Sequence, residues 1–499
     1  MHLAFCKLAI RLAILYCSLM LAPVSAAVHE VQTDTQQVMF STQSGMPIRW
    51  VSCYPDCESA AAVRIVWFDQ ADGFLAWTLP AEPQLDAQLR GSEFEMQQTE
   101  TDEFVQLVFR SKHSFDGSHV VFDYRLPKQG YRGELQARGI EGLALTFASG
   151  ASLIPEQLPG FGSIYSKVQP FSMDQARFSY LEPPESGFGA FDMHVASSIG
   201  IRSRYWLWLA SPHSQSVGEY AWADVNRPIV VVRASTGATE VILDTYTGPN
   251  EKNALNAADP RLTGVLFSAI WDWLRYLSFG LLFLLEWLHG FVGNYGLAII
   301  LLSLTVKILM FPLTYVADKW QAQVNATASL LKPKLDEIKR NFKGEEAHKK
   351  ILAVYKDHNV SQLYTLRSLF GFLIQIPVFI AAFDMLAESF VLDQASFLWI
   401  SDLAKPDSFA TLPFVLPFFG GQLNLLPFAM MALTILSALV QEEVDLTPDL
   451  MRQQRIKLLL MAFGFFLLFY TFPAGMVLYW TANNLFHLLK ILPARLLRR

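Results

Sequence analysis

The apolar positions of the chain fall into two blocks that flank a stretch of soluble character. Residues 1–26 and the region after about residue 265 hold most of the apolar residues. Between them, residues 28–258 contain short runs rich in Val, Ile, Phe, Tyr and Trp, separated by clusters of Gly, Pro, Asp and Ser. Several runs alternate apolar and polar positions, as half-buried β-strands do. The pattern predicts an exported all-β domain followed by an α-helical membrane core.

The β region, residues 28–258, is predicted to form one large two-sheet sandwich. Its histidines form no pair at helical spacing, and its carboxylates form no recognisable catalytic pair. This favours a β scaffold with a solvated polar surface, and a sugar- or peptide-binding cleft is the alternative. The predicted strands are Val63–Phe68, Phe104–Arg110, His119–Leu126, Tyr205–Leu209, Ile229–Arg233 and Glu240–Tyr246.

The first 26 residues resemble an export signal. Lys7 and Arg11 precede the apolar run 12–22, and small residues at 24 and 26 suit a cleavage site. We therefore predict a signal peptide over residues 1–26, cleaved after Ala26. A retained signal anchor is the alternative.

The second apolar block contains an apolar run with a cation in it. Residues 295–316 are long and apolar enough to cross a bilayer, yet Lys307 lies near their middle. A cation at the bilayer centre costs roughly 2.5–3.5 kcal/mol on insertion scales, so it usually faces protein or a wet cavity. Ser303 lies one turn earlier on the same face. Pro312 is expected to kink the span or to end it early.

Four further apolar runs give a predicted core of five spans over residues 294–495. Residues 260–293 are predicted to form a linker and an interfacial helix, because tryptophans and charges are interspersed in residues 268–292. Residues 317–360 are charged with a basic excess, which predicts a helical hairpin in the cytoplasm. The β domain then lies outside, and the basic tail 496–499 lies inside. The further predicted spans are 369–387, 424–441, 456–472 and 476–492.

The composition and charge of the chain argue against some classes of function. The chain has 499 residues, 52% of them hydrophobic, and a formal net charge of −6, so bulk charge gives no case for DNA binding. Two of its four cysteines, Cys53 and Cys57, are expected to form a disulfide in an exported domain. Two free thiols or a metal site are the alternatives. The sequence contains no P-loop motif, so it implies neither ATP use nor covalent chemistry. We also expect no cofactor, no metal and no enzymatic activity.

Three motifs together resemble the YidC/Oxa/Alb family of membrane protein insertases. Residues 287–314 resemble the family's first core span, and residues 373–386 (LIQIPVFIAAFDML) its Q-x-P-x-F span. Residues 472–485 (FPAGMVLYWTANNL) are similar to its final hairpin. The charged hairpin lies between the first two core spans, as in the family, and the large β domain resembles the bacterial YidC branch.

The resemblance implies a bacterial inner-membrane insertase whose spans surround a hydrophilic groove. The expected partners are nascent membrane proteins and the lipid bilayer, with the ribosome and the Sec translocon as further candidates. In the family the groove usually carries an arginine where this chain has Lys307. The matching groove residues are Ser303, Tyr479 and Trp480, and Gln375 and Asn483 are further candidates. Gln375, Asn483 and the adjacent Asn484 either line the groove or join helices.

Because the chain has a lysine in place of the arginine, the charge at position 307 depends on water in the groove. Arginine stays charged in any environment, whereas a lysine can lose its proton when it is desolvated, so Lys307 remains a cation only in a wet groove. The alternatives for Lys307 are snorkelling to an interface or pairing with Asp384 or with a polar group of another span. Two other functions compete with insertion: envelope assembly through the β domain, and small-solute transport, against which the absence of an internal repeat argues.

Overall fold

A computed structural model describes residues 28–496 except positions 61, 116, 176, 186, 225, 359, 362, 365 and 441–447. The predicted signal peptide, the tail and part of the loop 442–454 lie outside the described residues. The chain divides into two compact units. Unit 1 holds residues up to 157 and 163–268, and unit 2 holds 158–162 and everything from 269 onward.

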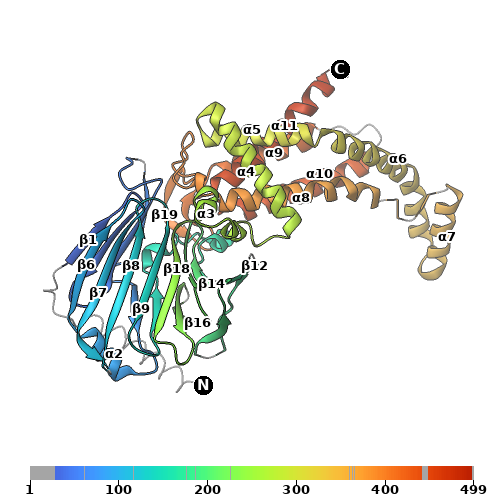
Figure 1. Cartoon of the computed structure of the whole chain (residues 1–499). Helices are drawn as coiled ribbons and strands as arrows, with labels where there is room; N and C mark the ends of the chain where they lie inside the picture. Colours follow the sequence, from blue (N-terminus) through green and yellow to red (C-terminus); the bar gives the residue numbers. More distant parts are fainter. Residues whose placement is uncertain are drawn as a thin grey trace. The chain divides into compact units, whose positions relative to one another are not determined.

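Unit 1 consists almost entirely of β-strands in three antiparallel sheets (Figure 1). The four-stranded sheet has the order β1 (Val28–Gln32), β2 (Gln36–Ser41), β3 (Pro47–Tyr54), β4 (Val63–Phe68). The five-stranded sheet has the order β13 (Gly189–Met193), β16 (Ser216–Asp224), β17 (Arg227–Ala234), β10 (Ala144–Ala148), β5 (Phe74–Thr78). The nine-stranded sheet has the order β12 (Arg177–Tyr180), β11 (Gln169–Asp174), β14 (Ser197–Arg202), β15 (Trp206–Pro212), β18 (Glu240–Pro249), β9 (Arg132–Arg138), β8 (Ser118–Pro127), β7 (Phe104–Phe115), β6 (Phe94–Glu100).

The core of unit 1 lies between the nine-stranded sheet and the two smaller sheets. Phe40 of β2 packs on Phe109 of β7, with ring centroids 5.6 Å apart. Phe147 of β10 packs on Trp208 of β15 at 4.3 Å. The prediction of two sheets is therefore corrected: the layer opposite the nine-stranded sheet is divided, because β3 and β5 are neighbours without forming a ladder. All six predicted strands are present.

The sequence pattern did not predict two short helices of unit 1 or the 3₁₀ segment near its C-terminal end. Helix α2 (Pro83–Arg90) follows β5, and α3 (Lys252–Ala258) follows β18. The Glu251 side chain caps α3 by accepting a hydrogen bond from the backbone N–H of Ala254. The 3₁₀ segment η3 (Pro260–Val265) comes next.

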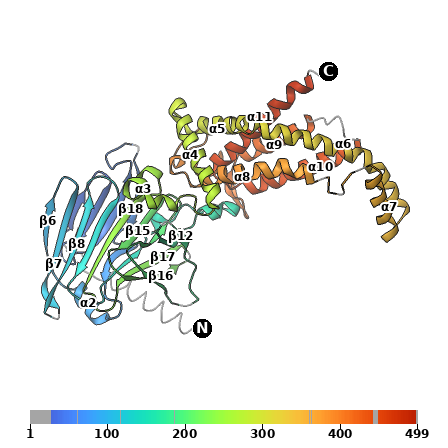
Figure 2. The ribbon, with the colours of Figure 1, turned by 45° about the vertical axis from the view of Figure 1, so that its right-hand side comes forward.

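Unit 2 is mainly helical (Figures 1 and 2). A small hairpin of β19 (Ala410–Leu416) and β20 (Gly420–Leu423) lies between helices α8 and α9 in chain order. The helices are α4 (Asp272–Val292), α5 (Tyr295–Leu309), α6 (Phe311–Asn341), α7 (Gly344–Asp357), α8 (Leu366–Glu388), α9 (Leu426–Val440), α10 (Pro448–Phe469) and α11 (Ala474–Leu496).

The predicted kink near Pro312 is present, and it places Lys307 near the end of a helix. Helix α5 ends at Leu309, and α6 begins at Phe311 with Pro312 in its first turn. The two helices meet at 61°. Lys307 therefore lies in the last turn of α5, just before the bend.

Among the described residues, no single helix combines the length and apolar composition of a membrane span. Helices α5 and α6 meet these criteria only as a bent pair. The count of five spans stays a prediction. Helix α10 also begins within the loop predicted over residues 442–454, since its first residue is Pro448.

The charged region forms the expected helical hairpin. Helix α6 continues from the bend as one long helix, and the chain turns at Phe342 and Lys343 before α7. Gly344 has a positive φ of 62°, which a glycine adopts without strain. In both views α7 lies at the end of α6 that is remote from α5 (Figures 1 and 2).

Candidate functional site

Lys307 is held by the last helix of the chain. Its Nζ donates to the backbone carbonyl of Asn483 at 3.0 Å and to the Oδ1 of the same residue at 2.9 Å. The side chain of Lys307 is half-buried. Its place in the last turn of α5 also suits a cation, because carbonyl groups there carry the negative end of the helix dipole. The predicted alternative of pairing with a polar group of another helix is therefore present, and Asn483 is that group.

Ser303 lies one turn before Lys307 and presents an unsatisfied hydroxyl. The residue is 2% exposed, and its Oγ has no hydrogen-bond partner in the described part of the chain. A buried hydroxyl without a partner costs free energy, and such groups call for an explanation. Ser303 and Lys307 thus place an unpaired hydroxyl and a partly accessible cation on one face of α5.

The facing side of α11 is a polar strip that the sequence interpretation only partly identified. Tyr479, Asn483 and His487 recur every four residues, so they share one face of the helix. Lys490 continues this face and forms an ion pair with Asp318 of α6 at 2.9 Å. His487 and Lys490 were missed, although their spacing from Asn483 could have identified them.

Trp480 lies apart from this strip. Its ring packs on Phe379 and Phe383 of α8 and on Phe465 and Phe469 of α10, with centroid distances from 4.6 to 6.1 Å. Tyr479, in contrast, is 6% exposed on the neighbouring face. The structure therefore separates the aromatic pair: Trp480 joins an aromatic cluster between helices, and Tyr479 shares a face with Asn483.

The remaining predicted groove residues have different positions. Gln375 on α8 is exposed, and it makes no hydrogen bond with Lys307 or Asn483 among the described residues. The side-chain N–H of Asn484 donates to Thr434 Oγ1 of α9 at 2.8 Å. Asn484 thus joins two helices, whereas the adjacent Asn483 binds Lys307.

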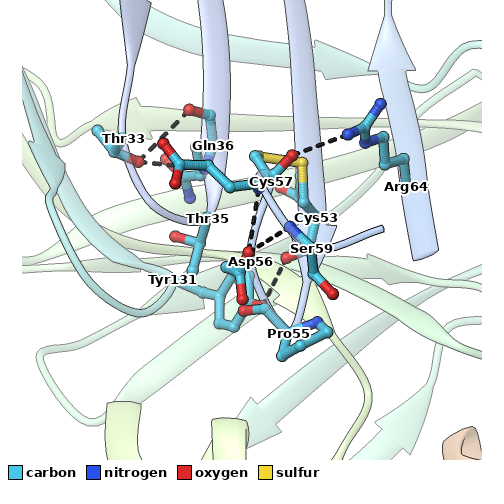
Figure 3. The surroundings of a disulfide bond; sticks show 12 residues. Thr33, Thr35, Gln36, Cys53, Pro55, Asp56, Cys57, Ser59, Arg64 and Tyr131 are labelled. Carbon is cyan, nitrogen blue, oxygen red and sulfur yellow. Dashed lines mark hydrogen bonds between the residues drawn. A yellow bond between two sulfur atoms is a disulfide. The ribbon is translucent and has the colours of Figure 1, made fainter. Parts of the chain in front are cut away.

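In unit 1, Cys53 and Cys57 are joined by a disulfide (Figure 3). The backbone N–H of Cys57 donates to the carbonyl of Asp34 at 2.6 Å. The hydroxyl of Tyr131 donates to the carbonyl of Cys53 at 2.6 Å, and burial raises the pKa of this phenol well above its ordinary value. The bridge fastens the turn after β3 to its neighbours.

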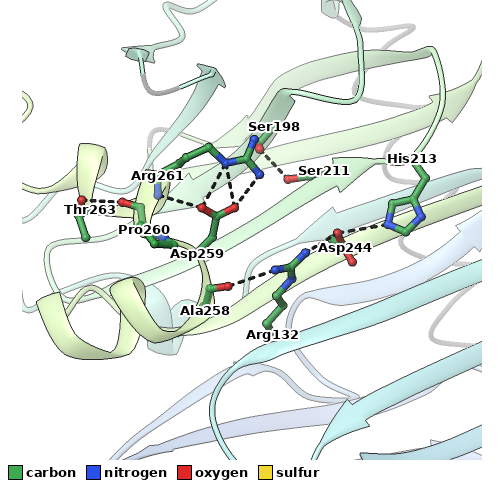
Figure 4. Close-up of polar contacts among 10 residues, drawn as sticks. All are labelled: Arg132, Ser198, Ser211, His213, Asp244, Ala258, Asp259, Pro260, Arg261 and Thr263. Carbon is green, nitrogen blue, oxygen red and sulfur yellow. Dashed lines mark hydrogen bonds and ion pairs between the residues drawn. The ribbon is translucent and has the colours of Figure 1, made fainter.

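Two charged clusters lie on unit 1 (Figure 4). Glu134, His213 and Asp244 bring possible metal-ligating atoms within 4.8 Å of one another. Each carboxylate already pairs with an arginine at 2.8 Å, Glu134 with Arg125 and Asp244 with Arg132. The positive charge that a metal would supply is thus present, and the cluster is better described as an ion-pair network.

The second cluster, Asp259 with Arg261, lies near the C-terminal end of unit 1. Arg261 donates to both carboxylate oxygens of Asp259, with a shortest distance of 2.6 Å (Figure 4). These hydrogen bonds lower the pKa of Asp259 below its ordinary value. Because Asp259 also accepts from the backbone N–H of Arg261, it fixes the start of η3.

Comparison with known proteins finds similarities to the helical half of the chain. Residues 287–495 match the family model of the 60Kd inner membrane protein. The chain is 29% identical over 323 residues to a membrane protein insertase YidC from Ectopseudomonas mendocina, covering 64% of this chain and 50% of that protein. It is 33% identical over 267 residues to the one from Cellvibrio japonicus, covering 53% and 43%.

The chain thus spans about half the length of the curated relatives it matches. A crystal structure of an active YidC insertase with its first transmembrane domain aligns with 98% of this chain and 99% of its own, at 16% identity. The TM-score of 0.35 is too low to support an argument about fold or function.

Proposed function

We propose that the protein is an insertase that inserts nascent membrane proteins into a bacterial inner membrane, since residues 287–495 match the family model of the 60Kd inner membrane protein and the chain is similar to curated YidC insertases. The observation that carries this proposal is the polar contact between α5 and α11. A partly accessible cation, Lys307, meets Asn483 beside the unpaired hydroxyl of Ser303. Apolar helices present such a constellation rarely without a functional reason.

The mechanism follows from the cost of moving polar groups through hydrocarbon. A nascent hydrophobic segment must carry its short polar flank across the bilayer, and each unsatisfied backbone group there costs several kcal/mol. A hydrated groove that reaches partway across shortens the dry path. The hydrophobic segment then leaves sideways into lipid, and no nucleotide or covalent step is required.

Lys307 supplies the attraction for an acidic flank. In the resting state its ammonium group is occupied by the neutral oxygens of Asn483. A carboxylate of the substrate makes a charge-assisted hydrogen bond, which is roughly twice as strong as a neutral one. The acidic flank therefore displaces Asn483 and is held while the apolar segment partitions into lipid. Ser303 offers the flank a second polar contact from the same face of α5.

The proposed topology places the parts of the chain on defined sides. The five helices of the core span the inner membrane, and α4 lies at its outer surface. Unit 1 is periplasmic, while the α6–α7 hairpin and the C-terminus are cytoplasmic. The basic residues of the hairpin suit contacts with anionic lipid headgroups or with a ribosome. Work beside the Sec translocon is compatible with this arrangement.

The test is complementation of a bacterium depleted of its own insertase, scored by insertion of a small two-span substrate with an acidic flank. We expect the Lys307→Met variant to slow insertion about tenfold or more, because the charged partner of the flank is lost. Lys307→Arg retains insertion, since arginine also donates to a carboxylate.

The matched control is Lys112→Met on β7 of unit 1. Lys112 pairs with Glu93 on a largely exposed surface, so its loss has little effect on folding. Membrane levels of all variants are compared by immunoblot. Undiminished insertion by Lys307→Met at normal levels would refute the role of the charge. Failure of the wild type to complement would refute the proposed activity.

A further inference from the structure

The β19–β20 hairpin of unit 2 and the residues beside it expose several large apolar side chains. Phe409, Phe414 and Phe418 are 53%, 57% and 49% exposed, and Val415 is 77% exposed. The flanking Leu416 is 38% exposed. Successive strand residues point to opposite faces, so neighbours such as Phe414 and Val415 expose apolar groups on both faces of the hairpin. A hairpin that lies in water usually carries polar residues on at least one face.

The charge pattern of this region points to lipid. Residues 408–440 contain no Asp, Glu, Lys or Arg, and the hairpin leads without a charged residue into the apolar helix α9. Helix α9 and the part of α10 after Lys457 expose apolar side chains as well, among them Leu436, Leu460 and Phe463. The apolar surface of the hairpin therefore continues along the chain into the surface that the proposed topology places against acyl chains.

The base and the turn of the hairpin are both fixed, so residues 412–415 between them are presented in a defined position. The hydroxyl of Tyr470 donates to the carbonyl of Gln422 at 3.0 Å. In the turn, Phe419 packs on the ring of Tyr470 at 5.3 Å, and Phe418 packs on Phe161 at 4.9 Å. The side-chain N–H of Asn424 donates to the carbonyl of Tyr470 at 2.6 Å. The Oδ1 of Asn424 accepts from the backbone N–H of Ser408 at 3.0 Å.

The backbone limits how deep the hairpin can enter a membrane. The ladder pairs Thr411 with Gln422 and Leu416 with Gly420, and residues 412–415 lie in the register shift between these pairs. A two-stranded hairpin also has two open edges, whose backbone groups cannot be left unsatisfied in hydrocarbon. Pro413 and Pro417 lack an N–H group and reduce this cost. The boundary between headgroups and acyl chains, where water is still available, satisfies both the side chains and the backbone.

We propose that the β19–β20 hairpin is an interfacial lipid-binding element. It inserts its bulged residues 412–415, here called the apolar tip, into the outer leaflet of the membrane, with Phe414 and Val415 as the main contacts. This inference rests on the topology given under the proposed function. The tip is held about 5–10 Å into the boundary between headgroups and acyl chains, as interfacial elements are. Because the hairpin carries no charge, its insertion does not depend on anionic lipid.

The test places an environment-sensitive fluorophore on single cysteines in the full chain, with Cys6 and Cys17 replaced by Ser and the Cys53–Cys57 disulfide left intact. The labelled variants are Val415→Cys, Leu460→Cys and Gln97→Cys, three exposed positions on the hairpin, α10 and β6. Proteoliposomes contain lipids with a nitroxide either near the headgroup or near the end of the acyl chain.

At Val415 we expect quenching by the shallow nitroxide to exceed that by the deep one about twofold, with and without anionic lipid. Leu460 responds more to the deep nitroxide, and Gln97 responds to neither. In a second variant, Phe414→Gln with Val415→Gln and a label at Phe409→Cys, the shallow quenching is lost. This variant keeps the base contacts of Tyr470.

Three outcomes overturn the proposal. Absence of quenching at Val415 while Leu460 is quenched refutes the hairpin inference alone. Absence of quenching at both positions refutes the membrane placement and, with it, the proposed function. Protection of Val415 from quenching together with a crosslink from the same cysteine to a second copy of the chain assigns the apolar tip to a protein interface.

Discussion

At the residue scale, two serines that look alike in the sequence differ in their surroundings. Ser303 on α5 and Ser437 on α9 are both buried, and neither Oγ has a hydrogen-bond partner among the described residues. Ser303 shares its helix face with Lys307, whereas Ser437 belongs to the helix that Asn484 joins through Thr434. Burial alone thus does not mark a groove residue. The neighbouring cation distinguishes Ser303.

We predict that Ser303→Ala reduces insertion several-fold without loss of thermal stability. Removing an unpaired buried hydroxyl relieves its desolvation cost, so Tm stays equal or rises. Insertion falls because the polar flank loses a contact. Thermal unfolding in detergent and the complementation assay measure the two effects. Ser437→Ala is the matched control: an equal loss of insertion in that variant would assign the effect to packing.

At the element scale, the turn after β3 depends on the disulfide in unit 1. The bridge joins Cys53, which is fully buried, to Cys57, which is 4% exposed. Its neighbours are backbone groups of Asp34 and the hydroxyl of Tyr131. These contacts come from two other segments of unit 1. The turn therefore helps to fix the four-stranded sheet against its neighbours.

We predict that the double variant Cys53→Ala with Cys57→Ala destabilises unit 1 by about 2 kcal/mol, the loop-entropy value for so short a closed loop. Pulse proteolysis of the full chain in urea, followed with an antibody against unit 1, measures the change. Wild-type protein treated with a reductant should show the same shift. Identical urea midpoints for the wild type and the double variant would contradict the prediction.

On the scale of the whole molecule, the charged α6–α7 hairpin extends from the same bend that positions Lys307. Helix α6 begins one residue after the break at Met310. Asp318, two turns into α6, pairs with Lys490 of α11. The bend thus links the proposed groove to the proposed cytoplasmic surface through one continuous helix.

Replacing the exposed lysines Lys339, Lys343 and Lys349 by Gln should weaken binding to ribosomes several-fold at low salt and flatten its salt dependence. Each lysine contributes through long-range attraction that salt screens. Cosedimentation of the detergent-solubilised protein measures the binding. The control removes the same number of charges from unit 1 at Lys112, Lys128 and Lys167. Unchanged binding in the hairpin variant would indicate that these lysines contact only solvent.

The order of elements was predictable because it depends on local periodicity. Alternation identified six strands of unit 1, and the bend near Pro312 followed from the chemistry of a single residue. The division of the second β layer was not predictable, because no local pattern states which strand edges meet. The β19–β20 hairpin was also missed, since its proline-rich apolar sequence resembles a loop as much as a strand.

The sequence by itself determined that a cation, a serine and a set of family motifs lie in the helical half of the chain, because these are properties of identity and spacing. Only the tertiary structure decided which groups meet. Lys307 and Asn483 are 176 positions apart, and their hydrogen bond depends on how α5 packs on α11. The same packing turned Trp480 away from Asn483 and into an aromatic cluster. Contacts over such separations are set by the packing of whole helices, which the local sequence pattern does not encode.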